Sequence, residues 1–422
     1  MSIFQKILHK NKKQDLNKDE LYLALDIGTE VVKGLLFKIS DIGVEIISTS
    51  YLRQPLKAMQ AGRVLDTDLV VKTSNQVIDA LFKNINMVRK PNITTIFGIA
   101  GELINGISVS ANINRLQRAD AIIDENEEEN ILNTLFEQIV GQGKQELADT
   151  LGIPKEQVLV LNVSVNGMYV DGRPVVSLKG QSGARISAFL YASFAPVSIV
   201  QTLSNIVKEL RVKLAGIVVQ PYAVARSFVS RVDSDFSGIF IDIGGGTTDV
   251  ALVLEGFNIQ TQMFAFGGRA FTQRLANKFN LSYEMAEQRK IKYSAGALPA
   301  DLARQVREVL REDVKLWLDT VKVALQKMEG VQKFPSMIYL CGGGAMLPDI
   351  QDTIMTYPWA KFLPFEKHPK VALTTPQKQD KVYDKTGKLV YPYDVTPVAL
   401  ARYLYDIITN KKYNYVGFEY ES

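Results

Sequence analysis

The chain has 422 residues, of which 46% are hydrophobic and 22% charged, a composition that accommodates two globular domains with more than one core. Its formal net charge of +4 is modest for this length, and no aromatic and basic module accompanies it, so we expect no nucleic-acid partner. One cysteine and two histidines exclude a disulfide framework and a Cys/His metal cluster, and no apolar stretch has transmembrane length or the pattern of a signal peptide. We therefore expect a cytoplasmic protein.

Residues 1–20 differ in composition from the rest of the chain. Apolar residues that fall on one face of a helix are interspersed with lysines: Ile3, Phe4, Ile7 and Leu8, with Lys6, Lys10, Lys12 and Lys13. Basic amphipathic helices lie in anionic membrane surfaces, so residues 2–10 are a candidate membrane-binding segment. So few apolar side chains bind a membrane weakly, and many copies on one polymer would have to act together. A disordered tail is the alternative, and residues 11–20 read as a polar linker.

The first structured element is an apolar strand that ends in a glycine turn, over residues 21–36. Asp26 stands two residues before Gly28, Thr29 follows, and Lys33 lies on the return strand. Glycine lets a turn press its backbone N–H groups against a ligand, and successive N–H groups form a nest for phosphate oxygens. An aspartate at the strand end can hold hydrated Mg²⁺. The alternative is an ordinary glycine hairpin in a β-rich core.

The region after this hairpin changes character along the chain. Residues 66–82 have the spacing of an amphipathic helix, and residues 94–101 form a strand that runs into a turn. From 102 to 182, short strands, one helix and a hairpin around 169–173 predict a small α+β unit. Its acidic run, 124–129, is either the N-terminus of the helix or a docking surface.

A second acidic glycine turn follows in the middle of the chain. A helix over 196–214 and a strand over 217–219 precede Gln220, which opens another helix. The turn itself lies between two apolar strands, within residues 240–253, and it contains Asp242, Gly244, Gly245, Gly246, Thr247 and Thr248. Two such turns facing each other would clamp the phosphates of a nucleotide.

Further candidate binding residues lie on the helices beyond the second turn. Gly267 and Gly268 lead into one helix, and Glu287 and Lys290 share a face of the next, because residues three apart are neighbours on a helix. An exposed ion pair is the alternative for the latter two. After a long amphipathic helix over 302–328, a third glycine run contains Gly342, Gly343, Gly344 and Ala345.

The last part of the chain is more polar. Cys341 ends the strand before the third glycine run and is expected to be a small buried residue. Residues 364–394 predict a projecting hairpin that turns at 384–387, whose glycine spacing excludes a Walker loop. The last helix starts at Val395, and residues 411–422 form a short tail whose last residues, 415–422, are acidic.

The three glycine runs carry a family resemblance. Asp26-x-Gly-Thr with Lys33, Asp242-x-Gly-Gly-Gly-Thr-Thr and Gly342-Gly-Gly-Ala-x-Leu-Pro resemble the first phosphate, second phosphate and adenosine motifs of the actin-like ATPase superfamily. The resemblance implies an α/β fold of duplicated actin-like (ribonuclease H-like) domains with a small α+β inserted subdomain, and ATP with Mg²⁺ in the cleft.

The same resemblance implies roles for individual residues. Asp26 and Asp242 would hold the metal, while Asp242 and Gln220 would orient the water that attacks the γ-phosphate. A helix-capping amide is the alternative for Gln220. Glu287 and Lys290 would reach the ribose and adenine, and the glycines and threonines of the three runs would hold the phosphates and the adenosine.

Four shorter matches in the same order resemble the bacterial cell-division family FtsA, at 62–64, 99–101, 169–172 and 180–186. That family carries an extra subdomain at the place of the predicted α+β unit. The implied organisation is an N-terminal segment and linker (1–20), a first half (21–101 and 183–216) interrupted by the insert (102–182), a second half (217–394) with an upper subdomain at about 270–330, a return helix (395–410) and a tail (411–422).

The chain departs from the FtsA pattern in two places. The family tends to have a glycine in the second connecting segment, where this chain has residues 395–401 without one, so the packing at the domain hinge stays open. FtsA proteins usually end in a basic amphipathic membrane helix, whereas residues 415–422 are short and acidic. We therefore expect residues 2–10 to be the element that faces the membrane.

The implied function is that of an ATP-binding, filament-forming adaptor that links the FtsZ ring to the cytoplasmic face of the inner membrane at the division site. Its partners would be the FtsZ C-terminal tail, other divisome proteins, further copies of itself and an anionic membrane surface, and any ATP turnover would be slow. A PilM-like component of type IV pilus assembly is the alternative, because it shares these motifs and a similar insert. A chaperone would need a substrate domain after the last helix, and a sugar kinase would need a substrate pocket and a catalytic acid that the sequence does not show.

Overall fold

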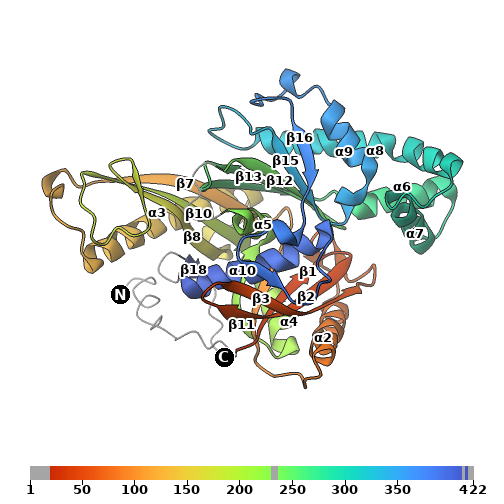
Figure 1. The fold of residues 1–422 in the computed structure, drawn as a ribbon, viewed down its shortest axis with the longest axis horizontal. Helices are drawn as coiled ribbons and strands as arrows, with labels where there is room; N and C mark the ends of the chain where they lie inside the picture. The colour runs from red at the N-terminus through yellow and green to blue at the C-terminus, as the bar shows by residue number, and fades with distance from the viewer. Residues whose placement is uncertain (1–19, 230–235, 411–413, 417–422) are drawn as a thin grey trace.

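The computed structural model of the protein describes residues 20–229, 236–410 and 414–416. Two halves, each built on a sheet, lie on either side of a central pair of helices, and a third unit projects from one end (Figure 1). The expected membrane-binding segment, residues 2–10, and most of the acidic tail lie outside the described residues. No helix within the described ranges is both long and apolar enough to cross a membrane.

The first half is built on a six-stranded sheet in the order β11-β6-β1-β2-β3-β17. The bounds are β1 (Tyr22–Ile27), β2 (Val31–Ser40), β3 (Gly43–Arg53), β6 (Thr94–Ile99), β11 (Lys213–Val219) and β17 (Val382–Asp384). Strands β1 to β3 form an antiparallel meander, while β6 runs parallel to β1 and β11 parallel to β6. Strand β1 is buried along its whole length, which is why its sequence is continuously apolar rather than alternating.

The second half repeats this arrangement in the order β14-β13-β12-β15-β16. The bounds are β12 (Gly238–Ile243), β13 (Thr248–Leu254), β14 (Asn258–Phe264), β15 (Met337–Cys341) and β16 (Lys370–Leu373). Again three strands form an antiparallel meander and two further strands run parallel to the first. The repeated topology confirms the predicted duplication of the α/β domain.

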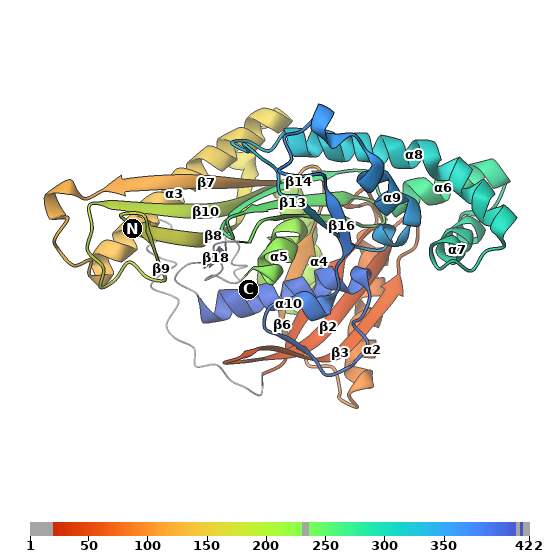
Figure 2. The same ribbon diagram turned by 45° about the horizontal axis from the view of Figure 1, so that its top comes forward.

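Helices cover the outer faces of both sheets and fill the space between them. In the first half, α2 (Thr67–Asn84) and α4 (Val197–Leu210) share a core with β1. In the second half, α6 (Gly268–Phe279), α7 (Tyr283–Ser294), α8 (Ala300–Gln326) and α9 (Pro348–Thr356) share a core with β12. Between the halves, α5 (Gln220–Phe228) and α10 (Val395–Thr409) contribute to a core that takes residues from both sheets (Figure 2). This shared core fixes how the two halves meet.

The inserted unit is larger than the sequence predicts. Its sheet contains β7 (Asn105–Asn114), β8 (Val158–Val170), β9 (Arg173–Val175) and β10 (Arg185–Pro196), covered on one face by α3 (Glu125–Leu151). Strand β10 pairs with both β7 and β8, so the insert runs to about residue 196 and not to 182. Sequence alternation alone does not tell which sheet a strand joins.

The acidic run at the start of α3 has a structural role. Asp124 caps the helix, accepting from the Glu127 N–H at 2.8 Å. Glu127 forms an ion pair with Arg115 at 2.7 Å, and fully buried Glu128 accepts from the Leu178 N–H at 2.9 Å. The run therefore forms the N-terminus of α3, the first of the two alternatives, and three of its carboxylates bind groups within the insert.

Two further boundaries move because of strand pairing. Strand β11 pairs with β6, so the first half continues to residue 219 instead of ending at 216. The expected projecting hairpin in 364–394 is absent: β17 lies along β3, and Asp384 accepts from the N–H groups of Thr386 and Leu389. The segment around β17 thus returns to the first half before α10 begins. Strand β18 (Asn414–Val416) adds to the edge of β8 in the insert.

Candidate functional site

A cavity of about 710 Å³ lies between the two halves, a size typical of small-molecule sites. Asp26, Gln220 and Asp242 are buried within it, while Tyr51 is exposed at its mouth. The sequence-predicted residues that line the cavity are Asp26, Gly28, Thr29, Lys33, Gln220, Asp242, Gly244, Gly245, Gly246, Thr247, Gly268, Glu287, Lys290, Gly342, Gly343 and Gly344. All three glycine runs therefore meet in one place.

The two aspartates face each other because of strand periodicity. On β1, Tyr22 and Ala24 belong to the core between the halves, and Asp26 continues that face at the strand end. On β12, Phe240 belongs to the same core, and Asp242 follows it with the same alternation. The alternate residues along each strand belong to the outer cores of the two halves instead. Each strand thus delivers its aspartate to the cavity between the halves.

Asp26, the aspartate before the first turn, is held by two donors from neighbouring elements. The Gly28 N–H closes the turn by donating to the Val31 carbonyl at 3.2 Å. Asp26 accepts from the Gln220 amide at 2.8 Å, and its other oxygen lies 3.4 Å from Lys33 Nζ. Lys33 also donates to the Tyr393 carbonyl at 2.8 Å. Gln220 begins α5 without a side-chain capping bond at that helix start, so its amide serves Asp26 and not the helix.

The second turn is closed by the Gly244 N–H, which donates to the Thr247 carbonyl at 2.9 Å. Asp242 accepts a hydrogen bond from the hydroxyl of Thr396, which lies on α10. Burial raises the pKa of Asp242, although the bond from Thr396 opposes the shift. Asp249 lies opposite Asp242 in the β12–β13 register. Burial and the charge of Asp242 raise the pKa of Asp249 well above its usual range, and its Oδ1 has no hydrogen-bond partner.

The two turns touch each other through glycine backbone. A Cβ atom on Gly245 would lie 2.5 Å from Glu30 Cβ, and one on Gly246 would lie 2.5 Å from Thr29 Oγ1. Real Cβ atoms do not approach neighbours so closely, so a side chain at either glycine would push the halves apart. Glycine here is what allows one turn to rest against the other.

The third run completes one wall of the cavity. Gly342 has a φ of +82°, and its N–H donates to the Pro392 carbonyl at 3.1 Å. Gly344 packs so close to Ile243 that a Cβ atom would lie 2.3 Å from Ile243 Cγ2. Nothing lies within 4 Å of the place where a Gly343 Cβ would stand. Gly343 therefore borders open space that a ligand could use.

Glu287 and Lys290 form a buried pair on α7, not an exposed one. Lys290 Nζ lies 2.7 Å from Glu287 Oε2 and donates to the Gly268 carbonyl at 2.9 Å and to Thr272 Oγ1 at 2.7 Å. Burial would raise the pKa of Glu287, but Lys290 and the hydroxyl of Thr272 outweigh it and lower that pKa. Glu287 is therefore held as a carboxylate beside the cavity.

Three predicted binding residues do not line the cavity. Thr248 is fully buried, accepts from Trp317 Nε1 at 3.0 Å and donates to the Phe266 carbonyl, so it holds the core. Gly267 precedes α6 and packs against the second turn, where a Cβ atom would lie 2.6 Å from the Gly244 carbonyl. Ala345 is buried in the core of the second half. These residues support the turns from behind.

The structure also adds residues that motif reading missed. Glu30, Arg53, Arg269 and Tyr283 line the cavity near its mouth, and Asp249 and Thr396 lie near its floor. Thr396 occupies the connecting segment where the chain lacks the family's usual glycine, and its bond to Asp242 shows how that segment meets the second half. Asp249, the acid that follows Thr248, was readable from the sequence. No local sequence pattern indicated that the charged residues at the mouth belong to the site.

The donor set fits a nucleotide with a hydrated divalent cation. No group of three or more His, Cys, Asp or Glu placed to ligate a metal occurs among the described residues. Mg²⁺ needs no such group, because it keeps several waters and uses one or two carboxylates with the phosphates of its ligand. The unpartnered Asp249 oxygen and the buried Asp242 carboxylate are groups that a cation would satisfy. Turn N–H groups beside them suit phosphate oxygens.

Comparison with known proteins places the chain near two related families. The family model "Type IV pilus assembly protein PilM" matches residues 200–358. The cell division protein FtsA of Bacillus subtilis strain 168 is 24% identical over 357 residues, which covers 79% of this chain and 76% of that protein. FtsA of Enterococcus hirae is likewise 24% identical over 360 residues, and FtsA of Pseudomonas aeruginosa is 23% identical over 345 residues, 77% of this chain and 78% of that protein.

Among solved structures, the PilM–PilN type IV pilus biogenesis complex contains a similar chain. The match has a TM-score of 0.64 at 15% sequence identity, and it covers 91% of this chain and 98% of that chain. At this identity the match shows a shared fold. The sequence matches and the duplicated fold together confirm the resemblance first seen in the glycine runs: the chain is similar to FtsA proteins over more than three quarters of its length, and it shares the duplicated actin-like fold with PilM.

Proposed function

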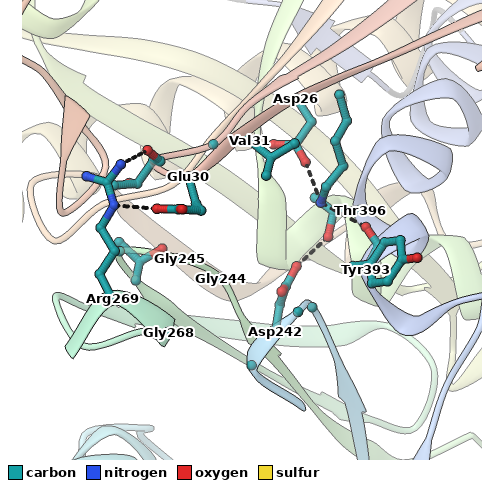
Figure 3. A pocket seen from close by; sticks show the side chains of 18 of the residues that line it. Asp26, Glu30, Val31, Asp242, Gly244, Gly245, Gly268, Arg269, Tyr393 and Thr396 are labelled. Carbon is teal, nitrogen blue, oxygen red and sulfur yellow. Dashed lines mark hydrogen bonds and ion pairs between the residues drawn. The ribbon is translucent and has the colours of Figure 1, made fainter. Parts of the chain in front are cut away.

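We propose that the cavity between the halves binds ATP with Mg²⁺. The observation that carries this proposal is the meeting of two acidic glycine turns, one from each half, beside a cavity of about 710 Å³ (Figure 3). The turn N–H groups would hold the phosphates, and Asp26 with Asp242 would hold the hydrated cation. Glu287 and Lys290, with open space beside Gly343, would take the ribose and adenine side. The cation would neutralise phosphate charge, and the chain supplies the carboxylates.

Equilibrium binding of a fluorescent ATP analogue tests this site. We expect saturable binding that requires Mg²⁺, and Asp26→Asn should weaken it more than tenfold, since a charge-assisted contact is worth about 1.5–3 kcal/mol. Asp79→Asn, which changes an exposed carboxylate on α2, serves as the matched control. Binding that is equally tight without Mg²⁺, or unchanged in Asp26→Asn, would contradict the assignment.

Any hydrolysis at this site would be slow. Gln220 and Asp242 are the residues that could orient a water, and both are engaged in the structure, Gln220 with Asp26 and Asp242 with Thr396. General-base assistance supplies only part of a rate enhancement. The nucleotide would therefore act mainly as a structural link between the halves.

We propose that the ATP-bound protein serves cell division as an actin-like adaptor at the cytoplasmic face of the membrane. The support is the sequence likeness to FtsA of several bacteria over more than three quarters of this chain. Copies stacked head to tail would form an open filament, since heterologous contacts do not close on themselves. Residues 2–10 would bind anionic lipid, and an FtsZ tail would bind the assembled filament.

Electron microscopy on an anionic lipid monolayer, with ATP and Mg²⁺, tests the adaptor role. The full chain should form filaments on the lipid, and a chain lacking residues 1–13 should not. A variant with Phe4 and Ile7 changed to Gln removes apolar surface at constant charge and should behave like the deletion. Vesicle binding by the truncated chain at the level of the full chain would overturn the membrane role of this segment.

A PilM-like role in type IV pilus assembly is the second candidate. The match of residues 200–358 to the PilM family model and the TM-score of 0.64 to a PilM–PilN structure favour it. The two roles differ in the peptide that binds. A peptide from the FtsZ C-terminal tail should bind under the division role, and the short cytoplasmic tail of a pilus membrane protein should bind under the other.

A further inference from the structure

A cluster of charged side chains crosses the mouth of the cavity from one half to the other. Glu30, on the first turn, accepts from Arg269 Nε at 2.6 Å and from Arg53 Nε at 2.9 Å. Arg53 Nη2 in turn lies 3.1 Å from Glu287 Oε1. Glu30 and Arg53 belong to the first half, whereas Arg269 and Glu287 lie on α6 and α7 of the second. Two ion pairs therefore join the halves here.

Arg269 is tied to both turns. Its backbone N–H donates to the Gly245 carbonyl of the second turn at 2.8 Å. Its side chain reaches the first half, where Nη2 donates to the Thr29 carbonyl and Nη1 to the Met59 carbonyl, both at 2.6 Å. The planar fork of an arginine suits several acceptors at once. One residue thus holds the two turns together.

These contacts lie apart from the chemistry at the floor. Figure 3 shows Arg269 and Glu30 on one side of the cavity, and Asp242 with Thr396 on the other. The side chains of Glu30 and Arg269 are only 15% and 18% exposed, so salt screens their pairing less than it would on the surface. Arg53 is 44% exposed and marks the outer edge. The pair between Arg269 and Glu30 is the more buried one, and Gly245 packs against Glu30 beside it.

We propose that Arg269, Glu30 and Arg53 position the two phosphate-binding turns and control nucleotide exchange, by holding the mouth closed until their ion pairs break. This inference rests on the proposed nucleotide site. Phosphates bound at the turns are anions, so they compete with Glu30 for the two guanidinium groups that line the same cavity. A nucleotide that enters therefore breaks these pairs for a time, and the pairs that re-form over it hold the mouth closed and slow its release.

The first test needs no nucleotide. Spin labels at exposed Lys83 on α2 and exposed Glu312 on α8, in a Cys341→Ala background, report the separation of the halves. Glu30→Gln and Arg269→Gln should widen the distance distribution, and Arg269→Lys should fall between them and the parent. Arg304→Gln, which removes an exposed pair on α8, is the matched control. Distributions that superimpose in all variants overturn the closing role.

The second test measures release of a fluorescent ADP by stopped flow. Arg269→Gln should release it about tenfold faster, the equivalent of losing about 1.4 kcal/mol, while Arg304→Gln should match the parent. If the parent binds nucleotide but the variants release it at the parental rate, control of exchange is refuted and the nucleotide site stands. If the parent binds no nucleotide, the proposed function and the exchange role both fail, and the label distances still decide whether these pairs close the cleft.

Discussion

Two adjacent glycines, Gly342 and Gly343, allow a sharp test of the site's geometry, because the structure assigns them opposite constraints. Gly342 has a φ of +82°, and a Cβ atom there would lie 2.2 Å from Asp242 Oδ1 and 2.5 Å from the Ile243 carbonyl. Gly343 has φ −67° and ψ −33°, and nothing lies within 4 Å of its Cβ position. The same substitution, glycine to alanine, should therefore have different effects at the two positions.

The magnitudes follow from backbone strain and overpacking. An alanine at 342 costs about 1–2 kcal/mol for the left-handed backbone and about 1–3 kcal/mol for displacing Asp242 and the Ile243 backbone, or about 2–5 kcal/mol in all. An alanine at 343 has an ordinary right-handed backbone and open space. It should stabilise the folded state by about 0.4–1 kcal/mol through the lower entropy of the unfolded chain.

Urea unfolding without nucleotide measures this difference. The only two tryptophans of the chain, Trp317 and Trp359, are both buried in the core of the second half, so their fluorescence reports the unfolding of the half that contains both glycines. Gly342→Ala should unfold at a clearly lower urea concentration than the parent, and Gly343→Ala at the same or a slightly higher one. Equal midpoints for the two variants would refute the reasoning. Gly343→Ala should nevertheless weaken nucleotide binding, because its methyl group enters the cavity.

Three further predictions concern the buried acids. The raised pKa of Asp249 makes the free energy of unfolding fall as the pH rises above 3.8, the ordinary pKa of an aspartate. Asp249→Asn should therefore be more stable than the parent by about 1–3 kcal/mol at pH 8. Urea titrations should show that this difference in stability narrows toward pH 4. Thr396→Val leaves the Asp242 carboxylate without its donor and should cost about 1–3 kcal/mol, whereas Thr396→Ser should cost far less; equal midpoints would contradict this bond. Because the pKa of Glu287 is lowered, its pairing with Lys290 stabilises the fold above pH 4.5, and this stabilisation is lost as the pH falls through the lowered pKa. Glu287→Gln should therefore be less stable than the parent at pH 7, and the stabilities of the two proteins should converge in acid.

Much of the site could be predicted from the sequence because its chemistry is local. A phosphate-binding turn needs glycine at fixed positions after an apolar strand, and an acid at the strand end, and both requirements are visible in a dozen residues. Strand alternation then carries Asp26 and Asp242 to the faces that meet, as the shared core of Tyr22 and Phe240 shows. Helix starts were readable for the same reason, as with Asp66, whose side chain caps α2.

Contacts between distant segments were decided by the tertiary structure. Which sheet β10 and β11 join depends on the edges available to them, and sequence alternation is the same in either sheet. Thr248 belongs to the same motif as Thr247 yet turns into the core, because the strand that begins there alternates its faces. The pairs between Arg269 and Glu30 and between Thr396 and Asp242 join residues 239 and 154 positions apart. Such pairs carry no local signal, because only the packing of the two halves brings their charges and hydroxyls within bonding distance.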